Sequence, residues 1–86
     1  MKDLEKLLKA LANRRRLAIL KYLKDNREAS VGDIAAAIHL SFQATSKHLS
    51  RLSAVDIVDK EQRSLQMFYF LNKEQKAAVQ RILFLL

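Results

Sequence analysis

The segment from Leu40 to Val55 carries side chains whose chemistry suits hydrogen bonding to nucleic acid. Gln43, Lys47 and Ser50 present an amide, an ammonium group and a hydroxyl at spacings of four and three residues. Glutamine can form two hydrogen bonds with adenine, lysine can reach the acceptors of guanine, and serine can bond to a base or a phosphate. The segment contains no acidic residue that would repel a phosphate backbone. These residue types predict a surface that contacts double-stranded DNA.

A helix over Ser41–Ala54 would bring these three polar groups onto one face. At about 100° per residue, Thr45, Leu49 and Leu52 fall within a narrow sector on the opposite face. That sector is expected to lie in the core, because two of its three residues are leucine. The polar face is then expected to point to solvent.

Four further residues border this outward face. Ser46 and Arg51 flank it, while Phe42 and His48 are expected near the core boundary. An exposed helix also carries polar side chains for solubility alone, so the face does not identify a DNA contact by itself. The elements predicted on either side of the helix distinguish a DNA-binding face from a face that is merely solvated.

The preceding residues predict the first half of a helix-turn-helix. Ser30 and Asp33 have the spacing of a capping box, with aspartate in place of the usual glutamate or glutamine. The helix that they begin presents Val31, Ile34, Ala35 and Ile38 on one face. His39 and Leu40 then form a short turn, and histidine tolerates left-handed backbone geometry better than most residues. Ser41 is expected to cap the second helix, whose first N–H groups could take a phosphate oxygen.

The rest of the chain predicts three more helices and a hairpin. Asp3 is expected to cap a helix with Leu4, Leu7, Leu8 and Leu11 on one stripe, and Asn13 to cap a helix over Arg14–Lys24. The other expected elements are a polar loop over Asp25–Ala29, a strand from Ile57 and Val58 toward Gln62, its partner over Leu65–Leu71, and a final helix from the cap Asn72 to Leu86. The fold class is therefore mostly α with a small β-hairpin, a winged helix-turn-helix in the order ααααββα. Residues 1–86 are expected to form a single domain.

Composition narrows the class of protein. The 86 residues include 16 Lys and Arg against 9 Asp and Glu, a formal net charge of +7 that favours a polyanionic partner. The longest apolar run, Ile82–Leu86, is far shorter than the roughly 20 residues that span a bilayer. The N-terminal residues lack the pattern of a signal peptide, so a cytoplasmic location and no membrane partner are expected.

Catalytic and metal sites are not expected. The chain has no cysteine, no serine in the setting of a nucleophile elbow and no glycine-rich phosphate loop. Its two histidines, His39 and His48, lie about two and a half helical turns apart and would not share a metal-binding face. We therefore expect no enzyme activity, no cofactor and no bound metal.

Three segments resemble the ArsR (arsenical-resistance repressor) family of winged-helix regulators. Leu8–Leu20 resembles the opening of that family, Leu40–Leu52 its recognition helix, especially Ser46-Lys47-His48-Leu49, and Phe68–Leu71 the close of its wing. The resemblance implies a homodimeric repressor that binds a pseudo-palindromic operator, with the first and last helices at the dimer interface. Ile82–Leu86 is apolar on every side, which also favours an interface there. The expected interface residues are Leu4, Leu7, Leu8, Val79, Ile82, Leu83 and Leu86.

Three departures from the family pattern bear on function. Metal-sensing members often carry a Cys-x-Cys pair where this chain has Ser30 and Gly32. Others bind zinc through the last helix, which here offers Glu74 and no histidine. The wing usually has basic residues around a Gly-Arg tip, whereas this chain has Asp59, Glu61, Ser64 and Leu65, with Arg63 displaced as the tip cation. A regulator that does not sense metal is therefore expected, and minor-groove contact by the wing stays open.

The expected DNA contacts follow from the helix and the wing together. They are Ser41, Gln43, Ser46, Lys47, His48, Ser50, Arg51 and Arg63. The alternative is a winged helix that uses the same face to bind an acidic protein partner without reading DNA. A membrane-surface module is less favoured, because the leucines of the first helix are needed for packing.

Overall fold

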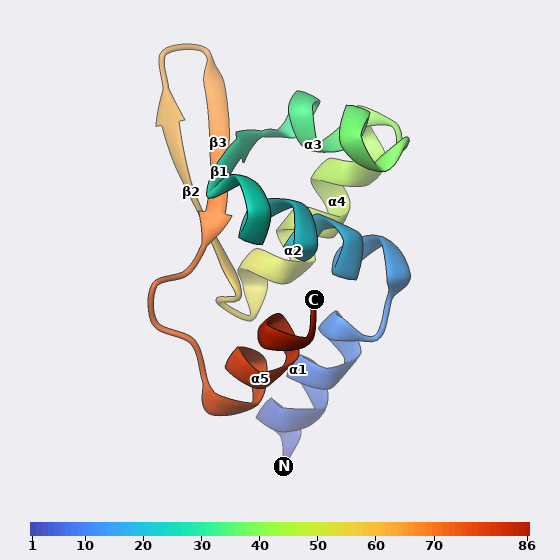
Figure 1. Cartoon of the computed structure of the whole chain (residues 1–86), viewed down its shortest axis with the longest axis vertical. Helices are drawn as coiled ribbons and strands as arrows, with labels where there is room; N and C mark the ends of the chain where they lie inside the picture. The colour runs from blue at the N-terminus through green and yellow to red at the C-terminus, as the bar shows by residue number, and fades with distance from the viewer.

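Five helices and three strands follow one another in the computed structural model, which describes residues 1–86 (Figure 1). The elements are α1 (Lys2–Leu11), α2 (Arg14–Asn26), β1 (Glu28–Ser30), α3 (Val31–Ile38), α4 (Phe42–Ala54), β2 (Val58–Arg63), β3 (Gln66–Leu71) and α5 (Ala77–Leu85). The predicted winged helix-turn-helix order is confirmed, with one short strand added between α2 and α3. None of the helices combines the length and apolar character needed to cross a bilayer.

The three strands form an antiparallel sheet in the order β1-β3-β2. In the hairpin, Val58 pairs with Leu71 and Arg63 pairs with Gln66, so the wing projects from the helical body (Figure 1). The prediction of a loop over Asp25–Ala29 was wrong. Its first residues extend α2, and Glu28 and Ala29 pair with β3. A strand of three residues is too short to show a period, and its pairing partners lie about forty residues away.

Side-chain caps begin three of the helices as predicted. The Asn13 carboxamide oxygen accepts from the N–H groups of Arg15 and Arg16. The Ser30 hydroxyl accepts from Asp33 N at 3.2 Å, and the Ser41 hydroxyl accepts from Ala44 N at 3.1 Å. The last two caps fix the start of both helices of the helix-turn-helix.

Two other predicted caps were wrong. Asp3 does not cap α1, because the helix already begins at Lys2. Its carboxylate lies in the first turn, where a negative charge interacts favourably with the helix dipole. Asn72 accepts from Glu74 N within a turn, and α5 begins only at Ala77, where Lys76 precedes it without a side-chain cap. Residues 72–76 instead cross from the sheet to the opposite end of the molecule (Figure 1).

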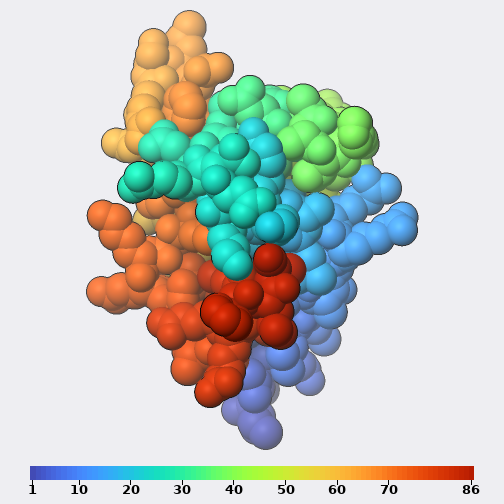
Figure 2. Space-filling model, viewed as in Figure 1, coloured from blue at the N-terminus to red at the C-terminus, as the bar shows by residue number.

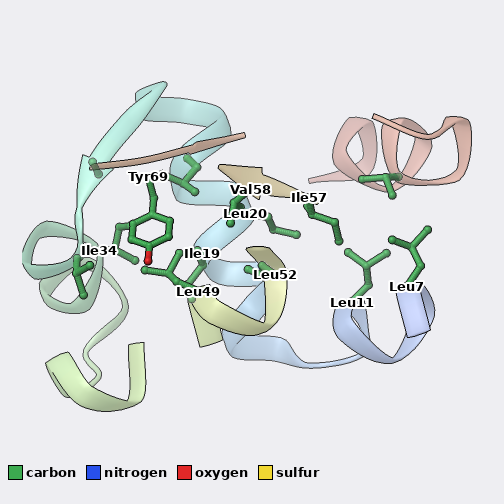
Figure 3. Packing of buried hydrophobic residues seen from close by; sticks show 14 residues of the cluster. Leu7, Leu11, Ile19, Leu20, Ile34, Leu49, Leu52, Ile57, Val58 and Tyr69 are labelled. Atoms are coloured by element: carbon green, nitrogen blue, oxygen red, sulfur yellow. The ribbon is translucent and has the colours of Figure 1, made fainter. Parts of the chain in front are cut away.

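The core is continuous through all the helices and the sheet (Figure 3). Ile19 and Leu20 of α2 are fully buried at its centre. Tyr69 of the sheet points toward Leu49, and Leu7 and Leu11 of α1 face Ile57 at the other end (Figure 3). Helix α4 is therefore packed against a core to which every element contributes.

Four chain reversals use non-glycine residues with positive φ. His39 ends α3 in the left-handed region, with φ 56° and ψ 49°, as its place in the turn predicts. Arg27, Asp56 and Ser64 also have φ between 58° and 68°. The single glycine, Gly32, is not among them.

Candidate nucleic-acid interface

Helix α4 is anchored through one face, as predicted. Thr45, Leu49 and Leu52 are each 0% exposed. Because these positions recur every three to four residues, their burial fixes the rotation of the helix about its own axis. The opposite face must then point away from the core.

The outward face carries the predicted polar groups at the surface. Gln43, Lys47, Ser50 and Arg51 are exposed, and Ser46 is half-buried beside them. An amide, an ammonium group, hydroxyls and a guanidinium therefore share one surface that has no carboxylate of its own helix. This set can donate to base acceptors and to phosphate oxygens, and the glutamine can also accept.

Phe42 does not lie at the core boundary, and that expectation was wrong. Its side chain is 60% exposed. It is the first residue of α4, and it lines a hollow together with Leu65 and Met67 of the wing. Ser41, just before it, is exposed, and its hydroxyl keeps a proton to donate after capping the helix.

The His48 side chain is hydrogen bonded to Arg16. The Arg16 Nη1 atom lies 3.2 Å from His48 Nδ1. Burial, followed by the charges of Arg16, Arg15 and Arg51, lowers the pKa of His48. A neutral imidazole that accepts at Nδ1 carries its proton on Nε2, and that atom is the one left to donate.

Arg16 also closes the end of α1. Its Nε donates to the carbonyl of Ala10, and its Nη2 donates to the carbonyl of Lys9 at 3.1 Å. The sequence does not identify this head group as a link between helices. The only signal was the unusual run of three arginines from Arg14 to Arg16.

The Arg63 guanidinium of the wing is engaged with acidic side chains. It is hydrogen bonded to Glu28 of β1 and to Glu61 at 2.8 Å, and it lies 4.9 Å from the ring centroid of Phe68. The hydrogen bonds to Glu28 and Glu61 raise the pKa of Arg63. Leu65, which is 97% exposed, forms the tip instead. The wing thus presents an apolar tip, and the charge of Arg63 is neutralised by Glu28 and Glu61.

The terminal helices present part of the predicted apolar surface. Leu7 and Val79 are only 3% and 1% exposed, so they lie within the core of the chain itself. Leu4 and Leu8 are 42% and 48% exposed. The predicted residues Ile82, Leu83 and Leu86 are half-buried.

The end of α5 adds two exposed side chains that were not predicted individually. Phe84 and Leu85 are 83% and 80% exposed. This end of the chain (dark red in Figure 2) forms part of the molecular surface. We call Leu4, Leu8, Phe84 and Leu85 the terminal apolar surface.

No group of three His, Cys, Asp or Glu side chains gathers anywhere in the chain. At the position of the Cys-x-Cys pair of metal sensors, the Ser30 hydroxyl is already used as a helix cap. Gly32 offers no side chain there. The residues present at this position are not a donor set for a soft metal.

Comparison with known proteins decides the family. The model of the bacterial regulatory protein, arsR family, matches residues 13–60, which run from the cap of α2 into β2 and include α3 and α4. The chain belongs to the ArsR family of bacterial regulatory proteins. It is a DNA-binding transcriptional regulator with a winged helix-turn-helix fold, in which α3 and α4 are the two helices of the helix-turn-helix.

Individual relatives agree with this assignment. The chain is 40% identical to the transcriptional activator HlyU of Vibrio cholerae over 77 residues, which cover 90% of this chain and 70% of that protein. The structure of reduced HlyU matches with a TM-score of 0.82 at 37% identity, over 98% of this chain and 84% of that one. The homodimeric winged helix-turn-helix DNA-binding domain of Mb0332 from Mycobacterium bovis has a TM-score of 0.82 at 28% identity, over 98% and 74%.

Proposed function

We propose that this regulator reads a specific duplex sequence through the outward face of α4. The observation that carries the proposal is the division of this helix into two faces. Its core face is completely buried, while Gln43, Lys47 and Ser50 are exposed together without a carboxylate. A helix so fixed can enter the major groove with its base-reading side chains already oriented.

The polar residues divide into reading and positioning groups. Gln43 and Lys47 are assigned to base edges, because an amide and an ammonium group match the acceptors and donors of purines. Ser41, Ser46, Ser50 and Arg51 are assigned mainly to phosphates, which fix register without specifying sequence. His48 can add a contact only through Nε2, since Arg16 occupies Nδ1.

Arg63 is the weakest of the assigned contacts. To reach a phosphate, its guanidinium must leave Glu28 and Glu61. Those carboxylates also oppose the approach of DNA to this side of the wing. We therefore assign the wing a minor share of the electrostatic attraction.

A homodimer is proposed from the terminal apolar surface. Leu4 and Leu8 expose about half of each side chain, and Phe84 and Leu85 expose about four fifths. Large apolar side chains exposed in this way on two helices favour an interface, and a twofold dimer is the commonest closed form. The related Mb0332 domain is homodimeric. Two copies of α4 related by a twofold axis would read a pseudo-palindromic operator.

The proposed regulator neither senses a metal nor catalyses a reaction. The chain has no thiolate, and no three potential ligands gather in the fold. We propose that the protein represses transcription by occupying its operator, in the cytoplasm. The relative HlyU is named an activator, so the sign of regulation is itself an outcome to be measured.

Selection of bound duplexes from a random pool tests the proposed function. The expected result is a pseudo-palindrome whose two halves are about 10 base pairs apart, one helical turn. The double variant Q43A/K47A should recover sequences without the preferred bases. If the wild-type protein enriches no sequence while retaining salt-dependent binding to random duplexes, specific readout by α4 is wrong. Failure to bind any duplex would favour the alternative of a protein-interaction module.

A further inference from the structure

A basic hollow lies between α1 and the C-terminal end of α4. Lys6 and Lys9 of α1, Arg16 of α2 and Arg51 of α4 line it, and small apolar residues complete its wall. No acidic side chain is among the lining residues. We call this feature the basic hollow. Of its four cations, only Arg51 belongs to the DNA contacts expected from the sequence.

The basic hollow continues the outward face of α4. At about 100° per residue, Ala54 lies in the same sector as Gln43, Lys47 and Ser50. Ala54 is also part of the wall of the hollow. The polar face of the helix therefore leads directly into the hollow at its C-terminal end.

The length of α4 would place this hollow beside a DNA backbone if the helix entered the major groove. From Gln43 to Ala54 the helix axis rises about 16 Å. The major groove is about 12 Å wide, so a helix that inserts its middle into the groove brings both ends near the phosphates that border it. Ser41 stands at one end of α4, and the basic hollow stands at the other.

The charges of the basic hollow have little internal compensation. Lys9 lies 3.7 Å from Glu5, but both side chains are at least 70% exposed, and a pair of that kind contributes little. Asp3 and Asp56 line a neighbouring hollow that also includes Lys6. Burial, followed by the charge of Arg51, lowers the pKa of Arg16. Arg16 and Arg51 line the same hollow, and an anion bound there would relieve the repulsion between their guanidinium groups.

The two flanks of α1 keep this hollow separate from the terminal apolar surface. On a helical projection, Lys6 and Lys9 lie on one side of the buried stripe, and Leu4 and Leu8 lie on the other. The leucine flank can therefore meet a second protomer while the lysine flank faces the same direction as the end of α4.

We propose that the basic hollow is a second DNA-binding site, which holds backbone phosphates at the inner edge of each half-site. The proposal rests on the proposed function, since it needs α4 in the major groove and α1 near the twofold axis. Lys6, Lys9 and Arg51 bind the phosphate oxygens. Arg16, held by the carbonyls of Lys9 and Ala10, supplies a fixed positive charge behind them.

Salt titration of DNA binding tests this site. The probes are the duplex recovered by selection and a random duplex of equal length, each measured with wild type, K6A/K9A and the control K21A/K73A. The control removes the same charge from α2 and from the loop that follows β3. Each lost phosphate contact should lower the slope of log K against log salt by about 0.9. A K6A/K9A dimer should therefore lose roughly 2 to 4 units of slope on both duplexes alike.

The outcomes separate this inference from the proposed function. The inference is supported if K6A/K9A weakens both duplexes equally, keeps the sequence preference and remains a dimer in sedimentation, while K21A/K73A keeps the wild-type slope. It is overturned if K6A/K9A matches the control while wild type still reads its operator. Ethylation interference gives an independent check: phosphates between the two half-sites should interfere with wild type and not with K6A/K9A. If wild type prefers no sequence, the proposed function fails first.

Discussion

Arg16 and His48 join the start of α2 to α4, with Nη1 of the arginine 3.2 Å from Nδ1 of the histidine. The same guanidinium donates to two carbonyls at the end of α1. One side chain therefore connects the helix that carries part of the proposed dimer surface with the helix that carries the proposed reading surface. The angle between these helices sets the spacing of the two half-sites that a dimer can engage.

The first prediction is that the folded protein becomes less stable at acidic pH. Because burial and nearby arginines lower the pKa of His48, the unfolded chain binds a proton at this residue more readily than the folded one. The free energy of unfolding should therefore be highest above pH 6.5, the ordinary pKa of histidine. It should decrease as the pH falls from there toward the lowered pKa of His48 in the folded protein. Denaturant titrations at pH 7.5 and pH 5.5 measure this loss. H48Q should show a smaller loss, and an equal loss in H48Q and wild type would contradict the assignment.

The second prediction separates reading from positioning on α4. Gln43→Ala should reduce discrimination at one base pair in each half-site by about 1–3 kcal/mol. Arg51→Ala should instead weaken all duplexes alike and lower the salt slope by about one unit per lost contact. Dissociation constants on the selected duplex and its single-base variants distinguish the two patterns. Direct readout is wrong if Gln43→Ala leaves every base preference unchanged.

The third prediction concerns assembly. Leu8→Glu combined with Phe84→Glu places two charges on the terminal apolar surface without entering the core, since both side chains are exposed. Loss of two such contacts should weaken the dimer by at least about 2 kcal/mol, or roughly thirtyfold. Sedimentation at micromolar concentration measures the shift to monomer, with circular dichroism as the check on folding. Leu65→Glu, at the even more exposed wing tip, is the control and should leave the dimer intact.

The fourth prediction concerns a buried hydroxyl in α4. Thr45 is 0% exposed and its Oγ1 has no hydrogen-bond partner. Thr45→Val replaces this hydroxyl with a methyl group of similar size and should raise the free energy of unfolding by about 1 kcal/mol. For a domain of this size the melting temperature should rise by roughly 4–8 °C. Thr45→Ser keeps the hydroxyl, loses the methyl and should be destabilising; a less stable valine variant would show that the hydroxyl is satisfied in solution.

Features that depend on short-range spacing were predicted well. The buried face of α4 follows from Thr45, Leu49 and Leu52, because apolar period alone determines which side of a helix meets the core. The caps Asn13, Ser30 and Ser41 were found for the same reason, since each acts on N–H groups two or three residues away. The helical order and the hairpin follow from these local signals.

Features that depend on distant partners were not predicted. Arg16 reaches His48 across thirty-two residues, and Arg63 reaches Glu28 across thirty-five. No period or motif in the sequence marks such pairs. The strand β1 was missed because its pairing with β3, and not its own residues, makes it a strand. Neither could spacing show that Leu7 is covered by its own chain while Leu8 is open.

The four reversals with positive φ determine how this chain tolerates substitution. Each one places a side chain, at Arg27, His39, Asp56 or Ser64, at a positive φ, which costs a residue with a Cβ atom about 1–3 kcal/mol. Glycine at these positions would relieve that cost but would give the unfolded chain more freedom, so the two effects should nearly cancel. A β-branched residue has no such compensation. Polar loop positions that look freely variable in the sequence, Ser64 beside the wing tip among them, are thus closed to valine, isoleucine and threonine for reasons of backbone shape alone.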